Sequence, residues 1–342
     1  EEGAGDLDSQ AFAAKLEALS ASFSFDVGDD TLSISVRVLT ENRAEALALL
    51  KTALMQPRFD PDAVERVRQQ VLSILASDAQ DPTDTAQRVW AEQAFGDHAY
   101  GTAYQGTESS IAELTRADLL AAHQNLLVRD TLSISAVGDI TAEDLGPILD
   151  DLLGDLPAGS ALETAPLQLD IPTGLTVVDM PTPQSVAIFG HAGIDRNHPD
   201  FFAAFILNTI LGGQGIESRL TAEVREKRGL TYGISTVLIS KDQANVMLGQ
   251  VASANDRINA AIEVIRDEWR KLARDGVTAE ELQAAQTYLT GAYPLRFDGN
   301  SQISRILVGM QRIGLGLDYI NTRNAKINAV TLSEINQVAA QL

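Results

Sequence analysis

Hydrophobic and polar residues alternate in two pairs of short segments, and each pair predicts a β-hairpin. In the first half, SFSFDV and TLSISVRVL flank the turn GDD, and in the second half TYGISTVLIS is followed closely by QANVMLGQVA. Strict alternation over such lengths is typical of strands that bury one face. We therefore expect each hairpin to lay one face against a hydrophobic core. Single strands are also expected in DTLSISAVGDI, GLTVVDM and QSVAIFGHAG.

Between these segments the apolar residues recur at helical spacing. Val64, Val67, Val71 and Ile74 follow a period of 3.6 residues and predict a long helix from Pro61 to about Asp78. Thr278 precedes Glu281 by three residues, which is the capping-box pattern of a helix start. Further helices are expected near residues 9–19, 41–56, 83–95, 116–125, 142–153, 256–274, 279–293, 301–313 and 333–342.

The order hairpin, helix, long helix, further helices occurs twice, at about 22–125 and 231–342. Antiparallel hairpins followed by runs of helices indicate an α+β fold of two similar domains, each an antiparallel sheet covered by helices. PAGSALETAPLQLDIP, residues 157–172, has three prolines and little periodicity. We interpret it as a linker between a first domain at 1–156 and a second at 173–342.

The stretch from Phe205 to Ser240 contains the candidate chemistry. An apolar helix is expected to end at a cluster of glycines, and an amphipathic helix to follow with Ile216, Leu220 and Val224 on its inner face. Arg225 and Tyr232 lie seven residues apart across the corner where this helix gives way to a strand. We predict that the guanidinium and the phenol share one rim. The glycines are Gly212, Gly213, Gly215 and, after the second helix, Gly229.

The amino-acid composition limits the classes of ligand and partner that such a site could bind. The 342 residues carry a net charge of -21, which disfavours binding to nucleic acid and to anionic membranes. The sequence shows no apolar run long enough for a bilayer span, so we expect no membrane insertion. There is no cysteine, which excludes thiolate chemistry and is compatible with the periplasm, while the cytoplasm stays an alternative.

The segment ILGGQGIESRLTAEVREKRGLTY resembles the second-domain signature of M16 peptidases, the pitrilysin, insulinase and mitochondrial processing peptidase family. Further matches are Gln184 before VAIFG, HAYG at 98–101 and QGT at 105–107. The resemblance covers almost the whole chain. It implies that Arg225 and Tyr232 assist catalysis, and that Gly212, Gly213, Gly215, Gly229 and Leu230 bind substrate. The glycines would let a peptide approach the backbone closely.

In that family the first domain carries the zinc motif His-x-x-Glu-His and a distant glutamate as third ligand. This sequence has no such motif, and the third ligand would fall near Ser73 or Ile74, neither of which binds zinc. The resemblance therefore implies a subunit that binds no metal or cofactor itself. Zinc would belong to a His-x-x-Glu-His partner in a heterodimeric metallopeptidase that hydrolyses peptides.

Two other functions stay open at this point. The chain could be a purely structural subunit, comparable to the core proteins of respiratory complexes that resemble the same family, although it keeps both Arg225 and Tyr232. It could also belong to a complete zinc peptidase whose metal motif lies before residue 1. Nucleotide binding is disfavoured, because Gly213-x-Gly215-x-x-Ser218 lacks the third glycine of a phosphate loop and follows a helix.

Overall fold

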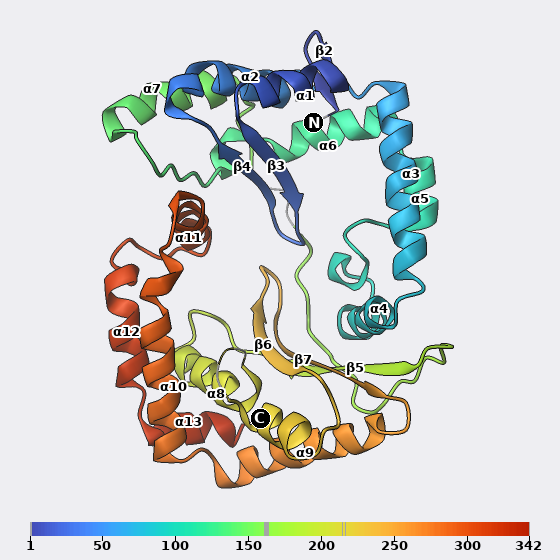
Figure 1. Cartoon of the computed structure of the whole chain (residues 1–342), viewed down its shortest axis with the longest axis vertical. Helices are drawn as coiled ribbons and strands as arrows, with labels where there is room; N and C mark the ends of the chain where they lie inside the picture. Colours follow the sequence, from blue (N-terminus) through green and yellow to red (C-terminus); the bar gives the residue numbers. More distant parts are fainter. Residues whose placement is uncertain (1, 161–163, 214, 216, 342) are drawn as a thin grey trace. The chain divides into compact units, whose positions relative to one another are not determined.

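A computed structural model describes residues 2–160, 164–213, 215 and 217–341 (Figure 1). The chain forms two compact units, and both are discontinuous in sequence. Unit 1 comprises Glu1–Ala76, Tyr104–Thr164 and Asp298–Leu317, and unit 2 comprises Ser77–Ala103, Ala165–Phe297 and Asp318–Leu342. Each half of the sequence thus contributes a segment to the unit that is built mainly from the other half.

Unit 1 is built around the first predicted hairpin, β3 (Ser22–Val27) and β4 (Leu32–Arg37), which pair antiparallel with Phe23 opposite Val36. Phe23 is buried in a cluster with Phe12 and leucines of the neighbouring helices, among them Leu50 and Leu152. The sequence alternation and the buried face therefore agree. The other elements of unit 1 are β1 (Gly3–Ala4), β2 (Leu7–Asp8), α1 (Ser9–Ala18), α2 (Arg43–Met55), α3 (Pro61–Asp78), α5 (Glu108–Glu113), α6 (Arg116–Leu126), α7 (Ala142–Leu153) and α11 (Asn300–Arg312), with 3-10 turns at Thr40–Asn42 and Arg129–Thr131.

The strand predicted in DTLSISAVGDI is wrong. After Thr131 this segment has no ladder partner, and side chains of α11 satisfy its backbone instead. The amide of Gln311 donates to the carbonyl oxygen of Ile134 at 2.7 Å and accepts from its N–H at 3.3 Å, and the hydroxyl of Ser135 donates to the carbonyl oxygen of Ser304 at 2.8 Å. A side-chain amide can replace a strand here because it offers both a donor and an acceptor.

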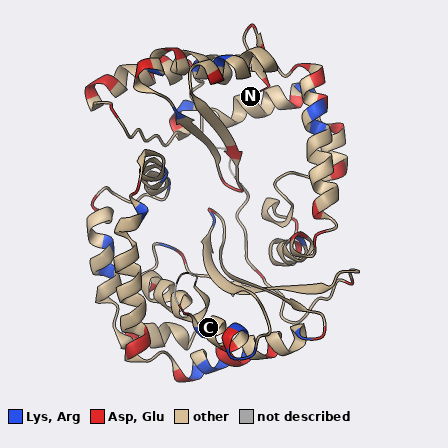
Figure 2. Cartoon of the chain, in the orientation of Figure 1, with Lys and Arg blue, Asp and Glu red and all other residues tan. Residues whose placement is uncertain are grey.

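Unit 2 contains a three-stranded antiparallel sheet in the order β5-β7-β6. Its strands are β5 (Gln184–Ala192), β6 (Ile234–Ser240) and β7 (Asn245–Ala254). None of them contains Asp, Glu, Lys or Arg, whereas the helix at Ile258–Asp275 is rich in these residues (Figure 2). β6 and β7 form the second predicted hairpin. The helices of unit 2 are α4 (Pro82–Phe95), α8 (Phe201–Gly212), α9 (Ile258–Asp275), α10 (Ala279–Ala292), α12 (Tyr319–Ala329) and α13 (Leu332–Ala339), with 3-10 turns at Ala99–Gly101 and Pro294–Arg296.

The core of unit 2 lies between the sheet and its helices. Leu207 and Leu211 of α8, Val251 of β7 and Leu272 of α9 are buried in one cluster. The helix order predicted for each half is confirmed, and so is the α+β class with antiparallel sheets. α5 and α12 are additional helices that the sequence pattern did not predict. None of the described helices is both long and apolar enough to cross a bilayer.

The segment that precedes β5 departs from prediction. Leu167, Leu169 and Ile171 are partly buried against a cluster that includes Phe95 and Tyr100, so the last part of the predicted linker packs on unit 2. Residues 161–163 of that linker lie outside the described residues. The strand predicted in GLTVVDM is also wrong, because residues 173–183 form no ladder and several of its apolar side chains are exposed.

Candidate functional site

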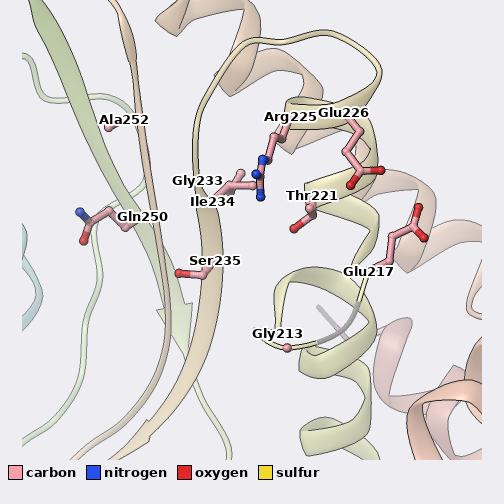
Figure 3. A pocket seen from close by; sticks show the side chains of 11 residues that line it. Gly213, Glu217, Thr221, Arg225, Glu226, Gly233, Ile234, Ser235, Gln250 and Ala252 are labelled. Atoms are coloured by element: carbon pink, nitrogen blue, oxygen red, sulfur yellow. The ribbon is translucent and has the colours of Figure 1, made fainter. Parts of the chain in front are cut away.

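A groove of about 750 Å³ opens in unit 2 where β6 begins. A π-helix, Thr221–Glu226, forms one wall. The beginning of β6 and the end of β7 form the other wall (Figure 3). Among the described residues, those that line it all belong to unit 2. They are Gly213, Gly215, Glu217, Thr221, Arg225, Glu226, Gly233, Ile234, Ser235, Gln250 and Ala252.

Arg225 reaches the groove because the helix that carries it is anchored on its other face. Leu220 and Val224 are completely buried, as their spacing predicts, and the third predicted position, Ile216, lies outside the described residues. Arg225 then points from the helix toward Gly233 at the start of β6 (Figure 3). Its guanidinium forms no ion pair with any residue that the structure describes, so the donors of this exposed side chain are available to a ligand.

The helix is wound more widely than an α-helix at this point. The N–H of Lys227 donates to the carbonyl oxygen of Ala222, five residues earlier, and a π-helix therefore replaces the predicted α-helix at Thr221–Glu226. Such insertions of one residue occur frequently at functional sites. They also require support from the surroundings, since the geometry is less favourable than that of the α-helix.

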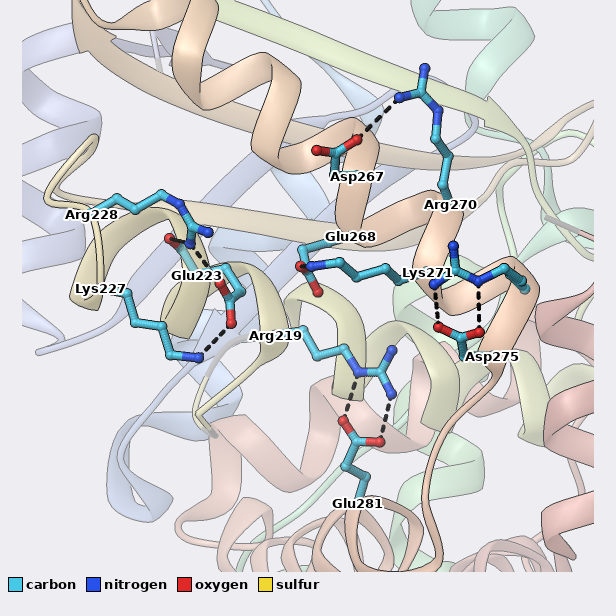
Figure 4. Close-up of polar contacts among 11 residues, drawn as sticks. Arg219, Glu223, Lys227, Arg228, Asp267, Glu268, Arg270, Lys271, Asp275 and Glu281 are labelled. Carbon is cyan, nitrogen blue, oxygen red and sulfur yellow. Dashed lines mark hydrogen bonds and ion pairs between the residues drawn. The ribbon is translucent and has the colours of Figure 1, made fainter.

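A network of ion pairs supplies that support (Figure 4). Arg219 donates from two nitrogens to both carboxylate oxygens of Glu281 at 2.6 Å, and also to the carbonyl oxygen of Gly276 at 2.9 Å. This fork ties the start of the helix to the start of α10. Burial disfavours ionisation of Glu281, but the bonds from Arg219 and from the Thr278 N–H outweigh it and lower the pKa of that carboxyl group.

A second group of ion pairs stabilises the end of the same helix. Glu223 accepts from Lys227 at 2.6 Å and pairs with Arg228, and these two cations lower the pKa of Glu223 to about 2. Arg228 also donates to the carbonyl oxygen of Glu223 at 2.7 Å. The cations next to Arg225 are therefore committed to structure, while Arg225 itself is not. The sequence alone did not distinguish these roles within the run EVREKR.

Tyr232 lies on the corner that follows, with 90% of its surface exposed. Tyr232 is not among the residues that line the groove, whereas Arg225 is. The two predicted residues thus lie on the same segment of the chain, Arg225 in the groove and Tyr232 on the exposed corner that follows it. The turn before it begins at Gly229, whose φ of 58° lies in the left-handed region that glycine adopts without strain. Leu230, predicted to bind substrate, is half-buried and packs against the core of unit 2.

The glycine cluster has an internal packing role. A Cβ atom at Gly212 would lie 2.5 Å from Oγ1 of Thr236, and one at Gly213 would lie 2.6 Å from Cα of Thr209. The absence of a side chain at Gly212 lets α8 end directly against β6, and at Gly213 it leaves room for the backbone of Thr209 in α8 itself. Gly213 and Gly215 also line the groove, where Gly215 has a φ of 85° and a Cβ atom would lie 1.8 Å from the hydroxyl oxygen of Tyr288. Gly212 is buried and does not line it.

The chain offers no zinc ligands at the positions that the family pattern would use. Ile74 is half exposed on α3, and the nearby Glu65 accepts hydrogen bonds from Arg68 and Gln69 of its own helix. Across the described residues, no three side chains of the types His, Cys, Asp and Glu gather in a group that could hold a metal ion.

The motif HAYG at 98–101 forms hydrogen bonds with two other segments of unit 2. Nδ1 of His98 accepts from the N–H of Tyr100 at 3.1 Å, and its Nε2 lies 3.0 Å from the carbonyl oxygen of Ala165. The hydroxyl of Tyr100 accepts from the N–H of Gln243 at 3.2 Å. These contacts join α4, the segment before β5 and the β6–β7 turn, so the motif stabilises unit 2.

Comparison with known proteins places this corner in a known family. A family model described as "Peptidase M16 inactive domain" matches residues 113–289, which include the entire groove. The Helicobacter pylori protein named "Non-peptidase homolog YmxG" is 26% identical over 336 residues, which cover 98% of this chain and 78% of that protein. "Uncharacterized zinc protease Mb2805c" of Mycobacterium bovis is 28% identical over 311 residues, 89% of this chain and 70% of that protein.

A solved structure agrees with these relatives. The crystal structure of a peptidase M16 inactive domain from Pseudomonas fluorescens superposes with a TM-score of 0.87 at 26% identity, covering 99% of this chain and 82% of that one. The resemblance that the sequence motifs indicated is thereby confirmed. From the matched model, the relatives and the fold, the chain belongs to the M16 peptidase family and carries its inactive domain.

Proposed function

We propose that this chain is the subunit of a heteromeric M16 zinc peptidase that binds peptide and places Arg225 and Tyr232 at the active site of a His-x-x-Glu-His partner. The observation that carries the proposal is Arg225, an exposed cation without a described counter-ion that points into a groove beside an edge strand. A side chain that only solvated the surface would not need the π-helix and its two groups of ion pairs.

The chemistry expected of these residues is hydrogen-bond donation. The Arg225 guanidinium and the Tyr232 hydroxyl can donate to a peptide carbonyl oxygen, and the bond strengthens as negative charge develops on that oxygen. One such preorganised donor contributes roughly 3 kcal/mol to the lowering of an activation barrier. The zinc ion and its glutamate would be supplied by the partner, and this chain would contribute donors alone.

The peptide is proposed to dock in extended form. β6 is an edge strand of its sheet, and its residues Ile234 and Ser235 line the groove opposite Arg225. An extended peptide can add to such an edge through main-chain hydrogen bonds. Asn208 donates to the carbonyl oxygen of Thr236 at 3.4 Å, so the place available for strand addition is the beginning of β6.

We further propose a periplasmic location for the complex.

The test is proteolysis of an unstructured peptide by the purified chain, alone and mixed with the product of any adjacent gene that encodes a His-x-x-Glu-His chain. Arg225→Ala and Tyr232→Phe are compared with Arg270→Ala, which removes an exposed arginine of α9 that does not line the groove. We expect activity only in the mixture, lowered roughly 100-fold by either substitution at the corner and unchanged by the control. Zinc-dependent activity of the chain alone, or a mixture indifferent to both substitutions, would overturn the proposal.

A further inference from the structure

Thr231, the residue before Tyr232, is buried at the corner with 8% of its surface exposed. Its hydroxyl group donates to the carbonyl oxygen of Ala252 at 2.6 Å and accepts from the N–H of Gly233 at 3.0 Å, and it also lies 2.8 Å from the carbonyl oxygen of Gly233. One hydroxyl group thus bridges the residues on both sides of Tyr232 to the end of β7. A hydroxyl can do this because it is both a donor and an acceptor.

The residues just before Thr231 are fastened to the same place. Ser253 donates from its hydroxyl to the carbonyl oxygen of Leu230, and Arg257 donates to the carbonyl oxygen of Gly229 at 3.3 Å. Contacts from β7 and the turn after it therefore hold the chain from Gly229 onward. Thr231 is the last of these contacts before Tyr232 and the only one, among those described here, that also holds the residue after it.

The side chain of Tyr232 extends from this corner into solvent. Its side chain is 90% exposed, and it forms no hydrogen bond with any described residue. The backbone at 231–233 consequently fixes the direction of the Cα–Cβ bond from which the phenol extends. Donors that act on a transition state must be held close to their working position before the reaction, and displacement of about 1 Å can cost up to roughly 100-fold in rate.

We propose that Thr231 is the positioning residue for Tyr232, acting through its bridge between Ala252 and Gly233. Its relevance to peptide hydrolysis rests on the proposed function, but the bridge itself can be tested on this chain alone. In the sequence Thr231 is an unremarkable position within GLTYG. The tertiary structure gives it a role, because Ala252 lies 21 residues further along the chain.

The first test measures the mobility of the corner. The chain has no cysteine, so Tyr232→Cys provides a unique site for a nitroxide spin label. Labelled chains with Thr231, Thr231→Val, Thr231→Ala and Thr231→Ser are compared by electron paramagnetic resonance. Loss of the hydroxyl in Val or Ala should add a fast-motion component, and Ser should restore the original spectrum. Thr287→Val is the matched control, since that hydroxyl bonds only within α10. Identical spectra for all variants would overturn the proposal.

The second test separates positioning from general stability. In the active mixture, Thr231→Val should lower kcat roughly tenfold while KM changes less than about twofold, because binding along the groove does not depend on the phenol. In a Tyr232→Phe background the same substitution should cause no further loss. An equal loss in both backgrounds would show a merely structural role and would overturn the proposal. If the wild-type mixture is inactive, the proposed function fails, and the spin-label spectra still decide whether Thr231 positions the corner.

Discussion

Removal of Arg219 should destabilise unit 2 more than removal of any other described surface cation. Two of its nitrogens lie 2.6 Å from the Glu281 carboxylate, and a third contact reaches the Gly276 carbonyl oxygen at 2.9 Å. The two side chains are only 18% and 30% exposed. Hydrogen bonds to charged groups contribute about 1.5–3 kcal/mol each, and Arg219→Met also leaves a partly buried carboxylate unpaired. After discounting for partial screening, we expect a loss of about 3 kcal/mol.

The measurement is urea unfolding followed by tryptophan emission. Both tryptophans, Trp90 and Trp269, belong to unit 2, so the signal follows that unit alone. A cycle of Arg219→Met, Glu281→Gln and the double variant should give a coupling energy of about 2 kcal/mol, because neither substitution matters much once the partner is gone. A coupling energy below about 0.5 kcal/mol would refute the reasoning, since it would show that solvent replaces the fork at little cost.

The same pair makes a prediction about pH. The pKa of Glu281 is lowered from its usual 4.5 in the folded state, so the folded carboxyl group holds its proton less tightly than the unfolded one. The stabilisation is therefore complete above the unfolded pKa and is lost as pH falls through the lowered value. The difference in unfolding free energy between wild type and Arg219→Met should be constant from pH 6 to pH 8 and shrink steadily below about pH 4.5. A difference that stays constant at acidic pH would exclude an ionic origin.

Four further substitutions test other parts of the corner. Glu223→Gln should cost about 1 kcal/mol at pH 7. This cost should fall as pH drops below about 4.5 and disappear below about pH 2, where the folded carboxyl group is protonated; acid titration of unfolding checks this. Gly212→Ala should cost about 2 kcal/mol through overpacking against Thr236, whereas Gly229→Ala, which meets no atom, should cost only about 1 kcal/mol of backbone strain; equal losses in urea unfolding would contradict the assigned contacts. Arg225→Ala should leave the urea midpoint unchanged, since this side chain has no described ion pair; a marked drop would mean that it is structural.

The sequence indicated where local pattern and long-range structure agree. The hairpins at β3–β4 and β6–β7 alternate along their whole length, and the helices α3, α9 and α10 have strong periodicity or caps. The two failed strands show the limit of that reasoning. DTLSISAVGDI has the composition of a strand, but Gln311 of α11 bonds the backbone of Ile134 and Ser304 of α11 donates to the carbonyl oxygen of Ser135, from 177 and 169 residues further along the chain.

In the candidate site, too, some features follow from the local sequence and others depend on tertiary contacts. The sequence by itself determined that Arg225, Tyr232 and the glycines belong to one corner, because their spacing along a helix, a turn and a strand fixes local geometry. Only the tertiary structure decided which of three neighbouring cations is available, since that depends on the position of Glu223 relative to Lys227 and Arg228. It also decided that Gly212 serves packing against β6 and that Thr231 bridges to β7. The roles of Gly212 and Thr231 arise from contacts between segments distant in the sequence, which periodicity and spacing do not encode.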